Sequence, residues 1–495
     1  MSLVRNLALS ACAAALLATG RAEERNAWPV HVAQQDAAGQ VTSWESVGPL
    51  VFKKPAGEGG TVSGFRPFFL QTKDASGLTT EAAVLYPIFI YRADSDTYKW
   101  TILNLITRAG PKHSVTVYRA DQTEAFDLWI FWFSRQTGSP ETSYRALFPI
   151  GGTIKGRFGF DELSWVLWPL YFHTEKHGAV TTSSPWPFLR VTRGAEQGFA
   201  LWPLFGWRDR PERFHRSFYL WPLGWNNTIQ PPEEAAPGTP ATRQVAFLPF
   251  FAREQRDRYT NEDFLWPFFG YTDRTLPNRY HETRYLWPFL VQGHGDDRMV
   301  NRWGPFYTHS VVKGMDKTWV MWPLVRTATW SDAGVEQTKT QFLYALYWSL
   351  GQRSLTNPHA APADRTHLWP LFSKWDNGAG RQQFQLLSPL DLFFPDNHQV
   401  RENWTPLFAI YRFDQRGPDD RRWSLLWHLV TWRREAGARE FHLGPLFSVA
   451  SGPGQRRVAV GNGIFGWQRN PGETHPHFFW FDFPPKPGKL PNASR

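Results

Sequence analysis

Apolar side chains along this 495-residue chain gather in short runs that recur about every twenty residues. Each run has the same order: an aromatic or aliphatic residue, Leu, Trp, Pro, then Leu or Phe and often another aromatic residue, as in 166–171, 200–205 and 285–290. Gly, Asp, Asn and charged residues fill the intervals between runs. A fixed period of this length is typical of repeat architectures, so the pattern predicts one unit copied along almost the whole chain.

A proline stands at the same place in most units and is the anchor for aligning them. Nine anchors belong to a Trp-Pro dipeptide. The proline anchors are residues 29, 49, 67, 87, 149, 169, 187, 203, 222, 249, 267, 288, 305, 323, 370, 389, 406 and 445. Further units carry another residue there: Leu105, Ile130, Ala345, His428 and Gly463, with a last ragged unit around Trp480-Phe481. The count is therefore about 24 units.

The composition of each unit predicts β-structure. Short aromatic and aliphatic runs bounded by Gly, Pro, Asp and Asn are typical of strands and turns. A proline every twenty residues would break helices, and the residue before a proline is pushed towards extended geometry. The predicted fold class is all-β: an antiparallel hairpin repeat array of about 24 units of about 20 residues, either solenoid-like or propeller-like.

The anchor prolines are predicted to lie at corners between strands. A proline in the middle of a paired strand removes one hydrogen-bond donor, and an unsatisfied buried partner costs about 1–3 kcal/mol. Eighteen such losses would exceed the roughly 5–15 kcal/mol by which a domain is stable. Each unit is therefore expected to be a hairpin whose two arms meet at the Trp-Pro corner, with 214–220 as an arriving arm and 204–209 as a departing arm.

An outer-membrane β-barrel with one strand per unit is the alternative architecture. The twenty-residue spacing, the aromatic content and the even number of units favour it. Runs such as 218–223 disfavour it, because they are apolar on both faces, whereas the strands of a wide barrel alternate apolar and polar residues. The same runs predict that neither face of the array looks into water.

The ends of the chain indicate export. Residues 1–22 have the form of a signal peptide, with Arg5 before an apolar stretch and a small-residue cleavage site before Glu23. Cys12 stands in a sequence that resembles a lipoprotein cleavage box, but the apolar stretch continues beyond it, so lipidation of Cys12 is disfavoured. The repeat array is expected over 23–483, followed by a Pro-rich polar tail at 484–495. The expected location is the periplasm, the outer membrane or the cell surface.

Charge changes this picture little. The net charge is +10, and removing residues 1–22 with Arg5 and Arg21 leaves 52 − 44 = +8. The positive residues alternate with acids, as in 208–213 and 253–258, which predicts solvated loops and no specific nucleic-acid binding. Weak attraction to anionic lipid headgroups or polysaccharide is compatible with this charge.

No signature of catalysis, metal or cofactor binding stands out. The sequence has no Gly-x-Ser-x-Gly, His-Glu-x-x-His or P-loop motif, and Cys12 is the only cysteine. We interpret 293–297, with His294, and the Asp94-Ser95-Asp96 segment as polar turns, and His428 as a drifted copy of the anchor in preference to an unusual buried histidine. No cofactor and no metal site are predicted.

Aromatic residues just after the corner are the candidate ligand-binding residues. They come three to five residues after an anchor, next to the polar segments, where exposed rings could stack on sugars or lie at a lipid interface. The alternative is that they pack on neighbouring repeats. These candidates are Trp207, Trp225, Tyr271, Trp375, Trp432 and Trp467.

Three functions are compatible with the sequence. The favoured one is a non-enzymatic, exported envelope protein whose repetitive aromatic surface binds a polysaccharide or a protein partner, or has a structural role. The second is an outer-membrane barrel for transport or anchoring. The third is a glycan-active hydrolase with two carboxylates contributed by loops, which the sequence does not exclude.

Overall fold

The computed structural model describes residues 23–36, 40–113, 117–119, 122–395, 397–462, 464–469 and 477–478. The expected signal peptide with Cys12, the anchor Gly463, the last ragged unit and the 484–495 tail lie outside these residues. The chain divides into two compact units. Unit 1 comprises Met1–Tyr86 and Ala345–Arg495, and unit 2 comprises Pro87–Tyr344.

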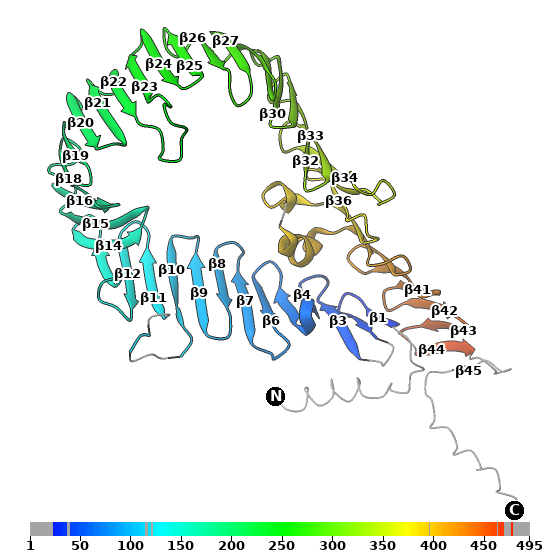
Figure 1. The fold of residues 1–495 in the computed structure, drawn as a ribbon. Helices are drawn as coiled ribbons and strands as arrows, with labels where there is room; N and C mark the ends of the chain where they lie inside the picture. Colours follow the sequence, from blue (N-terminus) through cyan, green and yellow to red (C-terminus); the bar gives the residue numbers. More distant parts are fainter. Residues whose placement is uncertain are drawn as a thin grey trace, which may run out of the picture. The chain divides into compact units, whose positions relative to one another are not determined.

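Unit 2 is a meander of antiparallel strands, each paired with the next along the chain. Figure 1 shows these strands side by side in one curved layer, from blue through cyan and green to olive. They are β8 (Phe89–Ala93), β9 (Thr97–Ile102), β10 (Ile106–Pro111), β11 (Thr123–Leu128), β12 (Trp132–Thr137), β13 (Tyr144–Leu147), β14 (Gly151–Arg157), β15 (Phe160–Val166), β16 (Tyr171–Lys176), β17 (Ala179–Ser183), β18 (Leu189–Gly194), β19 (Gln197–Leu201), β20 (Phe205–Arg210), β21 (Phe214–Tyr219), β22 (Gly224–Ile229), β23 (Thr242–Phe247), β24 (Phe251–Arg256), β25 (Tyr259–Phe264), β26 (Phe269–Arg274), β27 (Tyr280–Leu286), β28 (Leu290–Gly295), β29 (Arg298–Trp303), β30 (Tyr307–Val312), β31 (Met315–Val320), β32 (Val325–Asp332) and β33 (Val335–Phe342).

The anchor prolines of unit 2 lie in the turns between strands. Pro169 lies between β15 and β16, Pro222 between β21 and β22, and Pro323 between β31 and β32. Successive turns of a meander alternate between its two edges. Each twenty-residue unit contributes two strands, so all anchor turns fall on one edge and all polar turns on the other. The predictions of an all-β hairpin repeat array and of corner prolines are confirmed.

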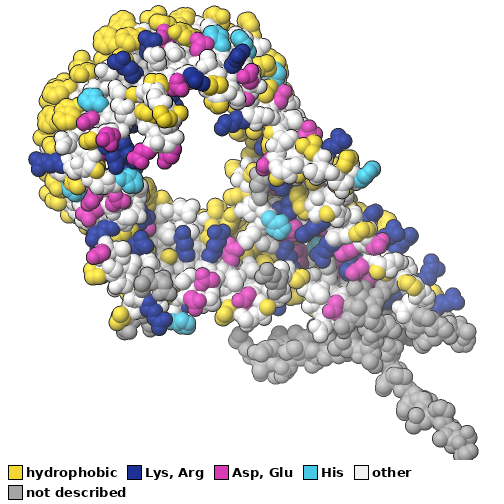
Figure 2. All heavy atoms as spheres, in the orientation of Figure 1, with side chains coloured by type: hydrophobic (Ala, Val, Ile, Leu, Met, Phe, Trp, Pro, Cys, Tyr) yellow, Lys and Arg dark blue, Asp and Glu magenta, His cyan; other side chains and the backbone are white. Residues whose placement is uncertain are grey.

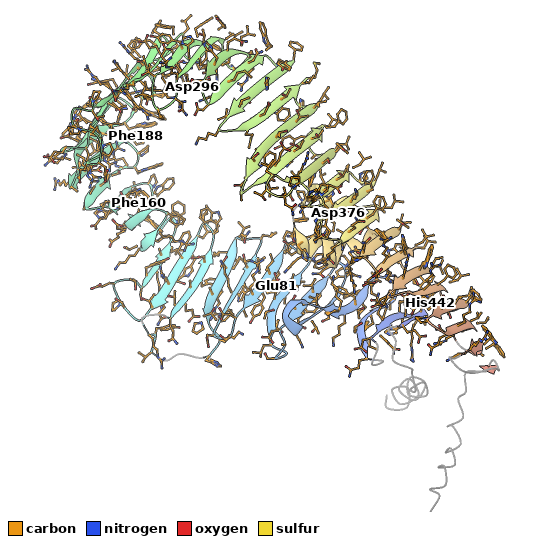
Figure 3. All side chains as sticks on the ribbon, turned by 45° about the vertical axis from the view of Figure 1, so that its right-hand side comes forward. Glu81, Phe160, Phe188, Asp296, Asp376 and His442 are labelled. Carbon is orange, nitrogen blue, oxygen red and sulfur yellow. The ribbon has the colours of Figure 1, made fainter. Side chains whose placement is uncertain are left out.

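The polar edge uses tighter connections. Several are two-residue turns in which a residue with positive φ precedes a glycine, as at His177-Gly178 (φ 49° and 74°) and Ala333-Gly334 (φ 48° and 77°). This backbone matches the twist of the flanking strands, which is why X-Gly pairs close two-residue hairpins. Figure 3 labels one residue at each edge, Phe188 in an anchor turn and Asp296 in a polar turn.

Two expectations about the array are wrong. The barrel alternative required one strand per unit, whereas each unit contributes two strands. Among the described strands of unit 2, β8 and β33 are not paired with each other, so the sheet is open. The apolar runs were expected to be shielded on both faces, yet Tyr219, Leu220 and Trp221 are each more than half exposed. The reason is their position, because the run spans an edge turn and not the middle of a strand.

Unit 1 contains two meanders. The N-terminal meander comprises β1 (Glu23–Ala27), β2 (His31–Gln35), β3 (Val41–Ser46), β4 (Val51–Pro55), β5 (Thr61–Phe65), β6 (Phe69–Lys73) and β7 (Thr79–Val84), with the short 3-10 helix η1 (Gly57–Gly59). The C-terminal meander comprises β34 (Tyr347–Ser354), β35 (Ala363–Leu368), β36 (Phe372–Asp376), β37 (Gln382–Leu386), β38 (Tyr411–Gln415), β39 (Arg421–Leu425), β40 (Val430–Glu435), β41 (Ala438–Leu443), β42 (Phe447–Gly452), β43 (Gln455–Val460), β44 (Phe465–Arg469) and β45 (His477–Phe478).

A helical segment interrupts the C-terminal meander between β37 and β38. It comprises the helices η2 (Pro389–Leu392), η3 (Val400–Trp404) and η4 (Thr405–Phe408). The anchors Pro389 and Pro406 thus lie in the first turns of 3-10 helices and not in hairpin turns, which differs from the prediction of β-structure in every unit. Proline fits there because the first turn of a helix needs no backbone donor. No helix in the described ranges is long and apolar enough to cross a membrane.

The helical segment gives unit 1 a second layer. Val400 and Trp404 of η3 pack against Phe52, Val62 and Leu70 of the N-terminal meander, and all five are buried. Segments more than three hundred residues apart therefore share one apolar core. Unit 2 has a core of its own within its single layer, formed by residues of β12 to β15 around Ile154 and Trp165.

Candidate functional site: the aromatic turn edge and an adjoining groove

The edge of unit 2 that carries the anchor turns is apolar and exposed, and we call it the aromatic turn edge. Its turns are 103–105, 129–131, 148–150, 167–170, 184–188, 202–204, 220–223, 248–250, 265–268, 287–289, 304–306 and 321–324. Every one of them exposes at least one large apolar side chain. Among the described turn residues of the opposite edge, only Val117, Phe158 and Leu276 do so. In Figure 2 apolar side chains gather along the rim over β18 to β26.

Backbone hydrogen bonds join each anchor turn to the one before it. In the turn 220–223, Leu220 N–H donates to the Leu204 carbonyl (2.6 Å) and Trp221 N–H to the Pro203 carbonyl (2.7 Å). Pro222 has no N–H, and Leu223 N–H donates back to Leu220 (2.8 Å). The turns 167–170 and 321–324 repeat this arrangement. The proline therefore occupies the one turn position where no donor is needed, and in these three turns every backbone N–H has an acceptor.

The first residue of several anchor turns has a left-handed backbone although it is not glycine. Leu167, Leu220 and Leu265 have φ of 44°, 46° and 45°, and their side chains are 55%, 54% and 54% exposed. This conformation costs an ordinary L-residue about 1–2 kcal/mol, and Gly or Asn would adopt it more easily. Leucine is thus kept at a strained position where its side chain contributes little to the core.

The tryptophan rings of successive turns contact each other. Trp168 lies 5.4 Å from Trp186, and Trp202 lies 5.9 Å from both Phe188 and Trp221, measured between ring centroids. Tilted ring pairs at such distances stabilise by about 0.5–1.5 kcal/mol beyond their buried area. These ring contacts join each hairpin to the next between Trp168 and Trp221.

Three of the six predicted aromatic residues lie in unit 2, but not on one face. Trp207 is paired with Ser217, and Trp225 is paired with Phe218. Because Ser217 and Phe218 are neighbours in β21, their side chains point to opposite faces, and so do the two tryptophans. The strand register places Tyr271 in the same cross-strand row as Trp207. A hydrogen bond with the Glu262 carboxylate raises the pKa of Tyr271.

The other three predicted residues lie in unit 1 and are separate from these. The Arg401 guanidinium covers the Trp375 ring at 4.1 Å from its centroid. Trp432 is half exposed and packs on Trp423 with centroids 5.1 Å apart. Trp467 lies half-buried in β44. The six residues therefore do not form one continuous row.

Trp225 does belong to a groove, with a volume of about 680 Å³, on one face of β18 to β25. Trp221 and Trp266 of the aromatic turn edge border it, and Phe218 lines it beside Trp225. Trp207 borders the groove as well, but the strand pairing directs its ring to the opposite face. Arginines and amide side chains line the part of the groove away from the turns.

The charges at the two ends of the groove differ. Near β18 to β21, Arg208 and Arg216 are directly opposite each other on paired strands, and burial and the Arg208 charge lower the pKa of Arg190. Near β25 to β27, Asp263 is 3.0 Å from Arg284, so this acid is neutralised. The segment 208–213 was predicted to be a solvated loop, but only 211–213 is a turn. Strand β20 continues through 208–210, so Arg208 and Arg210 point to one face of the sheet and Asp209 to the other.

Unit 1 holds a buried ionic network, the second concentration of polar groups. Glu24 of β1 is fully buried, and its carboxylate accepts hydrogen bonds from Arg422 (2.9 Å) and Thr431 (2.6 Å). Burial alone would raise the pKa of Glu24, but the charges of Arg422 and His442 and these hydrogen bonds outweigh it and lower the pKa. Figure 3 marks His442 in β41.

His428 extends this network to a second carboxylate. Its Nε2 lies 2.7 Å from the Glu45 carboxylate, which also accepts from Arg66 at 3.1 Å. Burial would raise the pKa of Glu45, but the Arg66 and His428 charges lower it. His428 does occupy the place of an anchor, in the turn between β39 and β40, but preferring this interpretation to a buried histidine is wrong, because its ring is largely buried and holds β3 against the C-terminal meander.

These carboxylates suit a structural role better than proton transfer. A general acid needs a carboxyl group whose pKa is raised, and the pKa values of Glu24 and Glu45 are lowered. Of the weak candidate segments, Asp94-Ser95-Asp96 is a turn, in which the Asp94 carboxylate accepts from the backbone N–H of Asp96 and Thr97. The prediction of a turn over 293–297 is wrong for His294, which lies in β28; only 296–297 is a turn, and Asp297 pairs with Arg274. The described residues contain no group of three or more His, Cys, Asp or Glu that could hold a metal ion.

Sequence reasoning missed the strained leucines and the facing arginines. The signal for the leucines was in the repeat itself, since Leu precedes Trp-Pro in most Trp-Pro copies. Alternation along the strand 214–219 could have predicted that Arg216 and its two neighbours in sequence point to opposite faces. The pairing of Arg216 with Arg208 could not be predicted without the strand register. The chain matches no protein-family model and no curated protein sequence.

Proposed function

We propose that this chain is an exported, non-enzymatic envelope protein that attaches to a lipid surface through its aromatic turn edge. The observation that carries the proposal is the exposed leucine with left-handed backbone at the start of anchor turns. Departures from local preference persist where function requires them. An apolar side chain held in water at a conformational cost is explained if a partner removes it from water.

The backbone of the edge supports a lipid partner. Groups that enter an apolar layer must have their hydrogen bonds satisfied internally. The hydrogen bonds of 220–223 do this for its backbone N–H groups, and its proline removes the remaining donor. One turn with the adjoining strand residues reaches about 5–10 Å, the depth at which interfacial segments are buried. The charged polar edge would then remain in water.

A lipid surface fits this edge better than a polysaccharide or protein partner. Leucine and isoleucine are exposed there beside the rings, and branched aliphatic chains offer no flat face for stacking on a sugar. The polysaccharide or protein partner expected from the sequence stays a prediction. Flotation with phosphatidylcholine vesicles, in parallel with co-sedimentation with insoluble envelope polysaccharide, separates the two.

The test is a triple variant of unit 2, Leu167→Asn, Leu220→Asn and Leu265→Asn. Each half-exposed leucine contributes about 1 kcal/mol when lipid covers it, so binding to phosphatidylcholine vesicles should weaken about 100-fold. Asparagine adopts positive φ more easily, so the free energy of unfolding should stay the same or rise. Binding is measured by flotation and by quenching of Trp fluorescence with brominated lipids.

The matched control relieves the same backbone strain on the polar edge. His177→Asn, Glu212→Asn and Ala333→Asn replace residues with φ of 49°, 61° and 48°. This variant should bind neutral vesicles like the wild type. Unchanged vesicle binding by the leucine variant, or equal loss in both variants, would refute attachment through the aromatic turn edge. So would binding of the wild type to polysaccharide but not to vesicles.

A further inference from the structure

The groove beside the aromatic turn edge is layered from apolar to polar. Phe218 and Trp225 form the row nearest the turns, paired across β21 and β22. Two residues further along the strands, on the same face, the register aligns Arg208, Arg216 and Asn227, and Gln244 continues this row. Along β21 to β23 a ligand in the groove would therefore meet rings nearest the turns and a cation and amides further from them. On β18, Arg190 is aligned with the row of rings.

The face that carries the groove has an excess of positive charge at its β18–β21 end. Arg190, Arg208, Arg210 and Arg216 lie on this face, and Glu196 pairs with Arg208 and Arg210, which leaves 4 − 1 = +3. Arg190 and Arg216 form no ion pair among the residues that the structure describes. Like charges directly opposite on paired strands destabilise a sheet. Glu196 offsets the charge of Arg208, and an anion beside Arg216 and Arg190 would offset the charges that remain.

The height of these groups above the turns matches a lipid headgroup. Arg190 follows the anchor Pro187 by three residues, about 10 Å at the rise of a strand, and Arg216 precedes Leu220 by four residues, about 13 Å. If the turns enter the lipid surface by about 5–10 Å, both guanidinium groups lie at or just above the level of headgroup phosphates.

We propose that this groove binds the phosphate-bearing sugar headgroup of a glycolipid whose acyl chains remain in the lipid layer beside the aromatic turn edge. The assignment rests on the proposed function. The planar guanidinium groups of Arg190 and Arg216 match phosphate oxygens in pairs. The Trp225 ring offers a flat face to the sugar, and the amides of Asn227 and Gln244 offer donors and acceptors for hydroxyl groups.

The test compares two double variants with the same loss of charge. Arg190→Gln with Arg216→Gln removes groove arginines. Arg193→Gln with Arg243→Gln removes exposed arginines whose side chains lie on the opposite face of the sheet. Flotation is measured with vesicles of phosphatidylcholine alone and with added phosphatidic acid, galactosyl diacylglycerol or lipid A. These additives supply a phosphate, a sugar, or both.

The wild type should prefer lipid A vesicles over each other composition. The groove variant should lose about tenfold or more of that preference while binding phosphatidylcholine like the wild type, and the control variant should keep the preference. Equal loss in both variants would indicate diffuse attraction and overturn the proposal. So would equal binding to lipid A and phosphatidic acid, or full competition by soluble glucose 1-phosphate. Failure of the wild type to bind phosphatidylcholine would instead refute the attachment through the turns.

Discussion

The two units use the same strands and turns but cover their surfaces differently. In unit 1 a helical segment lies over β4 to β6, and Glu24 and Arg66 are completely enclosed. In unit 2 the strands form one layer, and apolar side chains project from its anchor turns. The contrast has its origin in the sequence. Unit 1 contains Pro389 and Pro406, the two anchors that lie in helices, whereas the repeat of unit 2 is regular. Regular repetition extends an edge, and its interruption builds an enclosed core.

The stabilising interactions differ in range for the same reason. Unit 1 joins Glu24 to Arg422 and Glu45 to His428, across about four hundred residues of sequence. Unit 2 joins neighbouring hairpins only, through strand pairing and rings such as Trp202 and Trp221. Loss of one interaction is therefore expected to affect all of unit 1, but only a local part of unit 2.

The largest expected effect is that of Arg66→Met in unit 1. Arg66 is 1% exposed, pairs with Glu45, donates to the Pro49 carbonyl (2.6 Å) and lies over the Phe52 ring (3.9 Å). Removing it takes the arginine from the partly buried Glu45 carboxylate, which keeps only His428, and leaves the Pro49 carbonyl without its donor, at a combined cost of about 3–5 kcal/mol. Hydrogen exchange resolved by peptide should show faster exchange throughout unit 1. Arg243→Met, at an exposed site of unit 2, should change stability by no more than about 0.5 kcal/mol.

Acid should destabilise unit 1 next. The pKa values of Glu24 and Glu45 are lower in the folded state than the ordinary value of 4.5. Their stabilisation is present above pH 4.5 and is lost as the pH falls below it, on the order of 2 kcal/mol for each carboxylate. The exchange rates of unit 1 peptides between pH 6 and pH 3 measure this loss. In a Glu24→Gln, Glu45→Gln variant the dependence should flatten, and an unchanged slope would contradict the assignment.

The smallest expected effect is local to unit 2. Trp202→Ala removes a ring that contacts Phe188 and Trp221, at a cost of about 1–2 kcal/mol. Exchange should quicken in β19 to β22 and remain unchanged in β30 to β33, because each hairpin contacts only its neighbours. Uniform destabilisation of unit 2 would show that its hairpins unfold together. Both units would then unfold cooperatively, and the proposed contrast between them would not hold.

Much of the architecture could be predicted from the sequence, because it depends on local rules. The period, the β-structure and the position of Pro222 in a turn follow from residue spacing and from the missing N–H of proline. Exposure could not be predicted in the same way. The run 218–223 is apolar on both faces, and only the structure places it at an exposed edge that no other described layer covers.

The candidate site was predicted only in part. Trp225 lines the groove, but Trp207 points to the other face, because it follows its anchor by four residues and Trp225 follows its own by three. One residue of difference reverses the face of a strand. The ionic network of unit 1 was missed altogether, since no local pattern relates Glu24 to Arg422 or Glu45 to His428.

The hydrogen bonds between successive turns also bear on how such a chain can evolve. Leu220 and Trp221 take their acceptors from the preceding turn, and Leu223 offers its own carbonyl to Leu248 of the following one. A whole hairpin can therefore be duplicated or deleted within the row without leaving an orphaned donor. Each insertion would lengthen the row by about 10 Å, so internal duplication could adjust the span of the protein in fixed steps.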